Sequence, residues 1–204
     1  MIVTVLVLAT NNDGKVREFR ELLADLPFVV VAARDVGVNA FPPETGATFA
    51  ENARAKARFV TTFTGQPALA DDSGLIVDAL DGAPGVLSAR FGGEGLDDRG
   101  RVLLLLERLQ AVPQASRAAR FIAALSLSLP DGRLIESEGI LEGTIAEEPR
   151  GSAGFGYDPV FVVGHAGRTL AEMPDNEKNA ISHRARALDA LRPRLIAVLS
   201  VREN

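Results

Sequence analysis

The sequence predicts an α/β protein with a mixed β-sheet flanked by helices. Apolar runs typical of buried strands alternate with segments whose apolar residues recur at helical spacing, as in β-α-β crossovers. In addition, the predicted strands at residues 120–129 and 133–137 are separated only by the turn Pro130-Asp131-Gly132, which favours a hairpin. Crossovers combined with a hairpin give a sheet with both parallel and antiparallel pairs.

The chain is expected to begin as strand, polar loop and helix. Residues 3–9 have the composition of a buried strand, and residues 28–33 form a second one. The helix between them is predicted by apolar residues on one face: Val16, Phe19, Leu22, Leu23 and Leu26.

A second helix is predicted to start at Thr48, because Thr48 and Glu51 have the spacing of a capping box, and to run to about Phe63. Residues 67–70 and 75–80 are then expected to form two short strands on either side of an acidic turn.

The second half of the chain should contain a helix at residues 97–110, the hairpin, and a short strand at residues 161–163. Ser182 is expected to cap a final helix, which has on one face Ala185, Leu188, Leu191 and Leu195.

The composition narrows the class of protein. With 204 residues and 47% hydrophobic positions, the chain is expected to form a single domain over residues 1–204. The absence of cysteine rules out disulfides and thiolate metal sites and fits a reducing, cytoplasmic location. A net charge of −5 argues against a general nucleic-acid binder, and no apolar stretch has the length of a membrane span or the form of a signal peptide.

Lysine is scarce: of 22 lysines and arginines only three are lysines, namely Lys15, Lys56 and Lys178. A lysine ammonium is a mobile point charge that can follow a phosphate, whereas the arginine fork prefers fixed bidentate partners. Phosphate binding is therefore one reason to keep lysine at these positions. Chance in an arginine-rich composition is the other.

The sequence Asp71-Asp72-Ser73-Gly74 follows an apolar run and places two carboxylates side by side. On an extended segment neighbouring side chains point to opposite faces, so the two acids are expected to have different tasks. A carboxylate in a cleft suits Mg²⁺, with Glu44 as a candidate second ligand. The alternative is a solvated turn.

A glycine-rich segment, residues 151–159, carries the one tyrosine of the chain, Tyr157, close to Phe155. Glycines let the backbone approach a ligand, and an aromatic ring offers a flat face for a base; the two rings could equally be plugs in the core. His183 and Arg184 offer donors at the start of the last helix, although a lone histidine there is more often structural.

Several familiar motifs are missing. Gly14-Lys15 lacks the remainder of a Walker loop, and the glycines near Gly154 do not have the Rossmann spacing. No Gly-x-Ser-x-Gly elbow is present, and we interpret His165 as a loop residue.

Taken together, six segments resemble the inosine triphosphate pyrophosphatase-like family, which clears noncanonical purine nucleoside triphosphates. The segments are residues 9–15 (ATNNDGK), 44–53 (ETGATFAENA), 70–74 (ADDSG), 82–91 (GAPGVLSARF), 154–159 (GFGYDP) and 181–184 (ISHR). The resemblance covers nearly the whole chain. It implies a two-lobed α/β fold around a long central mixed sheet, a nucleotide cleft between the lobes, a homodimer, and hydrolysis of ITP, dITP or XTP to the monophosphate and pyrophosphate.

The resemblance also implies roles for individual residues. For the hydrolysis itself, physical reasoning predicts that Asp72 both binds Mg²⁺, with Glu44 as the candidate second ligand, and takes the proton from the attacking water. The triphosphate would be held by Thr10, Asn11, Asn12, Asp13, Gly14, Lys15 and Lys56, with Ser73 beside Asp72. The base would lie by Phe155, Gly156, Tyr157 and Asp158, and its pocket would be completed by Lys178, His183 and Arg184.

Base selection has a physical basis. Hypoxanthine and xanthine present a 6-oxo acceptor where adenine presents a 6-amino donor, so donors from His183 and Arg184 would discriminate by as much as ~10⁴-fold. Two alternatives stay open: a pyrophosphatase for modified pyrimidine or methylated nucleotides, and a nucleotide sensor that leaves its ligand intact.

Overall fold

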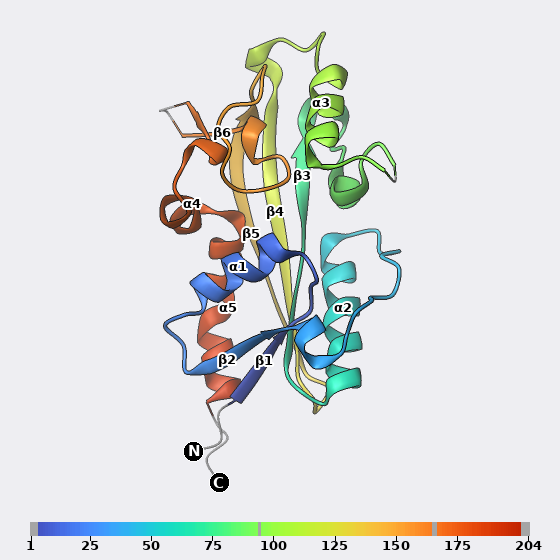
Figure 1. The fold of residues 1–204 in the computed structure, drawn as a ribbon, viewed down its shortest axis with the longest axis vertical. Helices are drawn as coiled ribbons and strands as arrows, with labels where there is room; N and C mark the ends of the chain where they lie inside the picture. Colours follow the sequence, from blue (N-terminus) through green and yellow to red (C-terminus); the bar gives the residue numbers. More distant parts are fainter. Residues whose placement is uncertain (1–3, 94, 165–166, 201–204) are drawn as a thin grey trace. The chain divides into compact units, whose positions relative to one another are not determined.

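The computed structural model describes residues 4–93, 95–164 and 167–200. Within these residues seven strands form one sheet in the order β2-β1-β3-β4-β5-β6-β7 (Figure 1). The strands are β1 (Thr4–Leu8), β2 (Phe28–Ala32), β3 (Ala68–Val77), β4 (Ala118–Ser128), β5 (Leu134–Ile145), β6 (Phe161–Val163) and β7 (Arg168–Thr169). The helices are α1 (Asp13–Leu22), α2 (Phe49–Thr64), α3 (Asp98–Arg108), α4 (Asp175–Ile181) and α5 (His183–Leu199).

The sheet is mixed, as predicted. Strand β1 pairs in parallel with β2 and β3, whereas β6 pairs antiparallel with β5 and β7. Strands β4 and β5 are neighbours joined by the tight turn after Leu129, whose N–H donates to the carbonyl of Arg133. None of the described helices is long and apolar enough to cross a membrane.

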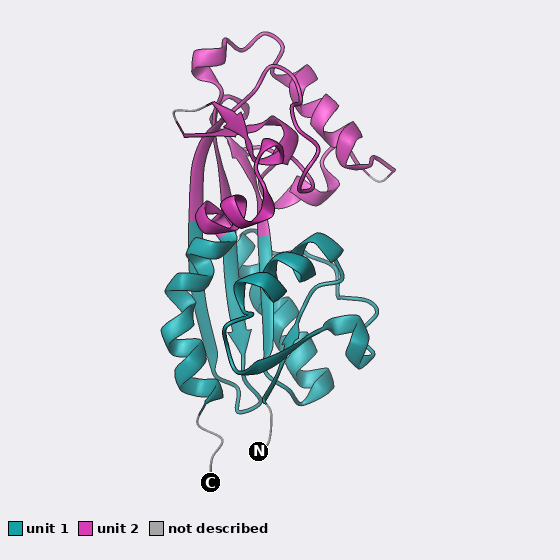
Figure 2. Cartoon of the chain, turned by 60° about the vertical axis from the view of Figure 1, so that its left-hand side comes forward, with its two compact units in different colours: residues 1–72, 123–139, 184–204 teal, residues 73–122, 140–183 magenta. Residues whose placement is uncertain are grey.

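The chain divides into two compact units (Figure 2). Unit 1 comprises residues 1–72, 123–139 and 184–204, and unit 2 comprises residues 73–122 and 140–183. Strands β3, β4 and β5 contribute residues to both units.

Unit 1 is layered around β1, which is buried on both faces. Leu6 and Leu8 pack into a cluster with α1 and α5, while Val7 and Ala9 pack into a second cluster with α2. This alternation explains why β1 is a continuous apolar run, since a central parallel strand is covered by helices on both sides.

Unit 2 has a core of its own. It is formed by β3 from Leu75 onward, by β4, β5 and β6, by α3, and by the segment around Tyr157. Asp97 caps α3 by accepting a hydrogen bond from the backbone N–H of Gly100 at 2.7 Å.

The structure confirms the predicted helices that became α1, α2, α3 and α5. It contradicts the two short strands around an acidic turn, because β3 runs without interruption through Asp71, Asp72 and Ser73. Asp71 and Asp72 are almost fully buried, so the solvated-turn alternative is also wrong. Strand β5 is longer than predicted, and β7 and α4 were not predicted. His165 lies outside the described residues.

Candidate active site

The loop before α1 is shaped by its own polar side chains. Thr10 Oγ1 accepts a hydrogen bond from the backbone N–H of Asn12 at 3.1 Å, and Asn12 Oδ1 accepts one from that of Lys15 at 3.0 Å. Asn11 Nδ2 donates to the carbonyl of Asn39 at 3.0 Å. The loop therefore fixes the N-terminus of α1, where the helix dipole favours anions such as phosphate.

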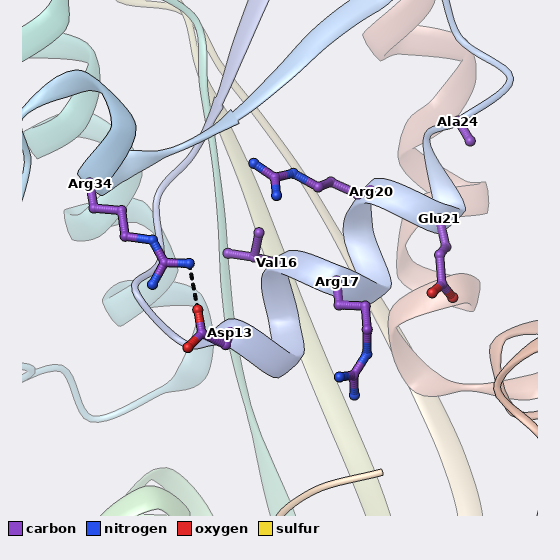
Figure 3. A pocket seen from close by; sticks show the side chains of 7 residues that line it. All are labelled: Asp13, Val16, Arg17, Arg20, Glu21, Ala24 and Arg34. Atoms are coloured by element: carbon purple, nitrogen blue, oxygen red, sulfur yellow. Dashed lines mark hydrogen bonds and ion pairs between the residues drawn. The ribbon is translucent and has the colours of Figure 1, made fainter. Parts of the chain in front are cut away.

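Asp13 and its ion-pair partner Arg34 border an open pocket of about 440 Å³ on the outer side of α1 (Figure 3). Further arginines line it, but Arg20 is itself paired with Asp35 at 3.3 Å. Because acids balance these cations, the charges of the pocket do not favour binding of an anion such as a triphosphate. We therefore do not place the active site there.

Asp72 belongs to a buried polar cluster in unit 1. Its Oδ1 accepts a hydrogen bond from Lys56 Nζ at 2.9 Å, and its Oδ2 accepts one from Asn52 Nδ2 at 3.2 Å. Lys56 Nζ also contacts Glu44 Oε1 at 2.7 Å. Asn52 and Lys56 are four residues apart, so α2 presents both on the same face toward β3.

Asp71 belongs to a different cluster. Its Oδ2 accepts a hydrogen bond from Arg184 Nε at 3.0 Å and forms an ion pair with Lys15 Nζ at 2.9 Å. Arg184 Nη1 donates in turn to Glu18 Oε2 at 2.9 Å. The two neighbouring acids thus have separate partners, as their alternation along the strand predicted.

Burial and charge shift the pKa values of these groups. Burial lowers the pKa of Lys15 below the ordinary lysine value, although the Asp71 carboxylate opposes this shift. Burial alone would also lower the pKa of Lys56, but Asp72 and Glu44 outweigh it and raise that pKa. Burial raises the pKa of Asp72, with Lys56 and Lys15 acting against it. A raised pKa makes Asp72 a better proton acceptor near neutrality.

In unit 2 the glycine-rich segment is held by Asp158. Its Oδ2 accepts hydrogen bonds from the backbone N–H of Phe155 at 2.9 Å and from Lys178 Nζ at 2.7 Å. Lys178 Nζ also lies 4.9 Å from the centre of the Phe155 ring. Gly154 has a φ of +77°, and a Cβ there would lie 2.1 Å from Asp158 Oδ2, so this turn requires glycine.

The other aromatic residue of this segment is part of the core. The Tyr157 ring is buried, and its hydroxyl donates to the carbonyl of Ser88 at 2.9 Å. The neighbouring N–H of Gly156 donates to Asp98 Oδ2 at 2.9 Å, which ties the loop to the first turn of α3. Direct contact between Tyr157 and a base stays a prediction, and its packing favours the core-plug alternative.

His183 is buried at the beginning of α5 and stacks on Phe121, with ring centres 4.8 Å apart and an interplanar angle of 11°. Ser73 is half-buried in β3, directly after Asp72.

A sequence model described as the Ham1 family matches residues 6–194. The chain belongs to the Ham1 family. The match confirms the resemblance predicted from the six segments.

Individual relatives agree with this membership. A protein called dITP/XTP pyrophosphatase from Thermus thermophilus is 54% identical over 91% of this chain and 88% of its own length. One of the same name from Symbiobacterium thermophilum is 53% identical over 95% of this chain and 96% of its own length. A solved HAM1 protein from Coxiella burnetii has a TM-score of 0.86 at 44% identity, covering 96% of this chain and all of that one. The Ham1 protein of Staphylococcus aureus has a TM-score of 0.83 at 35% identity, with the same coverage.

In this Ham1 family member the predicted site residues form two sets. Unit 1 contains the loop at residues 10–15 together with Glu44, Lys56, Asp72 and Arg184. Unit 2 contains Ser73, the residues from Phe155 to Asp158, Lys178 and His183. The chain passes from one unit to the other at four points, and two of these, the Asp72–Ser73 and His183–Arg184 peptide bonds, lie inside two of the six segments.

Sequence analysis assigned no role to Asn52, Glu18 or Asp98. Asn52 could have been found from its spacing of four residues from Lys56 on a predicted helix. Glu18 lies three residues after Lys15, but nothing in the sequence distinguishes it from the exposed Glu21.

The oxygens around Lys56 are of the chemical kind that binds magnesium. Glu44 and Asp72 converge on one ammonium group, which also donates to the carbonyl of Asp71 at 3.1 Å. Carboxylate and carbonyl oxygens are the hard ligands that Mg²⁺ prefers, usually with one or two carboxylates and the rest water and phosphate. Among the described residues no group of three or more acidic, histidine or cysteine side chains is arranged for a metal.

Proposed function

We propose that this chain hydrolyses noncanonical purine nucleoside triphosphates, namely ITP, dITP and XTP, to the monophosphate and pyrophosphate. The observation that carries the proposal is the pair of buried neighbouring carboxylates, Asp71 and Asp72, each bonded to a lysine, in a chain whose relatives are called dITP/XTP pyrophosphatases. Such a reaction removes deaminated purines from the nucleotide pool.

The unit 1 set suits the triphosphate. The N-terminus of α1, Lys15 and Lys56 supply positive charge, and we assign them to the phosphates that leave as pyrophosphate. Asp72 and Glu44 would hold Mg²⁺, which when bound neutralises phosphate charge and makes a coordinated water easier to deprotonate. Asp72 then takes the proton from the water that attacks the α-phosphorus.

The unit 2 set suits the base. Phe155 offers a ring face beside Lys178 and Asp158, and His183 offers a further polar group, so we assign base recognition to this set. Arg184 is also part of the predicted base pocket, but its Nε and Nη1 are engaged by Asp71 and Glu18. We therefore give Arg184 an anchoring task, and its contact with the base stays a prediction.

Product analysis tests the proposal. Pure protein is incubated with ITP, XTP, GTP, ATP and dTTP in magnesium, and pyrophosphate and orthophosphate are assayed separately. Pyrophosphate with monophosphate from ITP and XTP alone is the expected result. Orthophosphate release would move the attack to the γ-phosphate, activity on other bases would favour a pyrophosphatase for modified nucleotides, and silence would favour a sensor.

We also propose that the protein is a homodimer, as the family resemblance implies, and that it acts in the cytoplasm, which the absence of cysteine fits. Sedimentation velocity tests the first point, and a single species with the mass of one 21.6 kDa chain would reject it.

A further inference from the structure

Glu18 is a buried acid that the proposed chemistry does not use. It lies on α1, where it is only 5% exposed, while the neighbouring acid on that helix, Glu21, faces solvent. A buried carboxylate is costly unless it is paired, and Glu18 is paired with Arg184 at 2.9 Å. The question is what this pair does for the site.

The pair continues into the phosphate-binding set. Arg184 Nε donates to Asp71 Oδ2 at 3.0 Å, and the same oxygen forms an ion pair with Lys15 Nζ at 2.9 Å. Arg184 and Lys15 therefore share one carboxylate oxygen. Any change in how strongly Arg184 holds that oxygen alters the position and strength of the bond to Lys15.

Charge balance makes the four groups interdependent. Two acids, Glu18 and Asp71, face two cations, Arg184 and Lys15, with little water to screen them. The side chains of Glu18, Asp71 and Arg184 are between 0% and 7% exposed, whereas that of Lys15 is 14% exposed. Of these four, Lys15 is the member that reaches solvent, where a triphosphate would arrive.

We infer that Glu18 is a positioning residue that acts through Arg184 and Asp71 to hold Lys15 in place for the triphosphate. This inference rests on the proposed function, which assigns Lys15 to the phosphates. Without the charge of Glu18, Arg184 interacts more strongly with Asp71, competes with Lys15 for the shared oxygen and repels its ammonium group. The affinity for polyphosphate falls, while the chemistry at Asp72 in the neighbouring cluster is affected less.

The test compares Glu18→Gln with Glu21→Gln, a matched exposed control on the same helix. Binding of pyrophosphate and of IMP is measured by calorimetry, and KM and kcat are measured with ITP. Glu18→Gln is expected to weaken pyrophosphate binding and raise KM by about tenfold, a usual size for coupling in a shared network, with little change in kcat or in IMP binding. Glu21→Gln is expected to match the parent protein.

A double-mutant cycle separates positioning from general damage. In a Lys15→Ala background, Glu18→Gln should weaken pyrophosphate binding no further. Additive losses, or equal losses for pyrophosphate and IMP, would overturn the inference. If Glu18→Gln does not fold, Glu18→Asp is used instead, because it retains the charge on a shorter side chain. This variant should weaken pyrophosphate binding selectively, but by less than Glu18→Gln. Parent-like pyrophosphate binding in Glu18→Asp, with the contact of Arg184 and Lys15 to Asp71 displaced, would count against the inference.

The outcome is distinguishable from failure of the proposed function. Absence of pyrophosphate release from ITP by the parent protein would reject that function. The ratio of the affinity for pyrophosphate to that for IMP is measured by binding alone. It therefore tests the role of Glu18 even if the parent protein does not hydrolyse ITP.

Discussion

Asp71 and Asp72 are joined by one peptide bond yet work in different surroundings. Asp71 meets Lys15 and Arg184, while Asp72 meets Lys56 and Asn52. Strand geometry separates the two carboxylates, so the two buried acids do not face each other. The sequence could predict this separation because it follows from alternation alone.

Replacement of Asp72 by asparagine tests its role as the base. Asp72→Asn keeps the shape of the side chain but removes the proton acceptor, so kcat should fall by about 100-fold or more while KM changes much less. Steady-state kinetics with ITP give both quantities. Asp189→Asn, an exposed change on α5, serves as the control. Near-normal turnover of Asp72→Asn would remove Asp72 from catalysis.

The lowered pKa of Lys15 predicts a pH effect on binding. Lysine is charged below its pKa, so as pH rises Lys15 loses its charge earlier than an ordinary lysine would, and KM for ITP should rise on the alkaline side. Lys15→Arg keeps the charge throughout this range. We expect the alkaline rise in KM to disappear in this variant. Superimposable pH profiles for the two proteins would show that another group titrates there.

His183 is predicted to help read the 6-oxo group of the base. His183→Ala should reduce the ratio of kcat/KM for ITP to that for ATP by about tenfold or more, because a donor that favours the oxo group is lost. The variant also loses its stacking on Phe121, so its melting temperature must be measured alongside. An unchanged ratio in a folded variant would exclude His183 from base selection.

Some partners of the candidate site residues could be expected from the sequence and others could not, for a physical reason. The lysines stood out because lysine is scarce in this chain, and the two acids stood out because they follow an apolar run. The partners of Arg184, by contrast, come from positions 18 and 71, and no local pattern links residues so far apart. The same holds for Tyr157, whose hydroxyl partner is the carbonyl of Ser88.

Among the secondary-structure elements, β3 departs most from the sequence prediction. Asp, Ser and Gly ordinarily mark a turn, and the apolar residues on either side therefore read as two separate strands. Here Lys15, Lys56 and Arg184 compensate the acids from α1, α2 and α5, so the strand continues through them. Tertiary ion pairs override local propensity at this position.

The helices were predicted more accurately because their signals are local. Thr48 Oγ1 accepts from the backbone N–H of Glu51 at 3.2 Å, and Gly65 ends α2 with a φ of +67°. Both features involve residues within a few positions of the helix ends, where the sequence displays them directly.

The start of α2 supplies a prediction about Gly46. Its N–H donates to Asn52 Oδ1 at 2.8 Å, and a Cβ at this position would lie 2.6 Å from that oxygen. Gly46→Ala should therefore displace Asn52 and, through it, Asp72. We expect kcat/KM for ITP to fall by about tenfold, since small misplacements of catalytic groups are costly. The exposed neighbour Thr45→Ala should retain parent kinetics, and equal values for both variants would contradict the argument.

On the scale of the whole molecule, the mixed α/β class was predictable but the division into units was not. Unit 1 is assembled from three separate stretches of chain and unit 2 from two. Periodicity identifies strands and helices one at a time, whereas the grouping depends on which apolar faces meet. The family resemblance implied two lobes, and a nucleotide cleft between them stays a prediction.

The contribution of α5 to unit 1 can be measured. Leu191 is fully buried in the cluster that includes β1 and α1, so Leu191→Ala should reduce the free energy of unfolding by about 2–5 kcal/mol. Urea denaturation followed by circular dichroism gives this value. Ile196→Ala, on the same helix but 37% exposed, should cost much less. Similar losses for both would mean that α5 does not anchor unit 1.

The interleaving of the two units has a consequence for biosynthesis. Synthesis of unit 2 is complete once His183 has been added to the chain. At that moment unit 1 still lacks the rest of α5 and the leucines that this helix buries. Domains fold as units once their residues are available. Unit 1, whose Lys15 and Lys56 have long been translated, is thus the last to be completed, and Arg184 joins Asp71 only at that final stage.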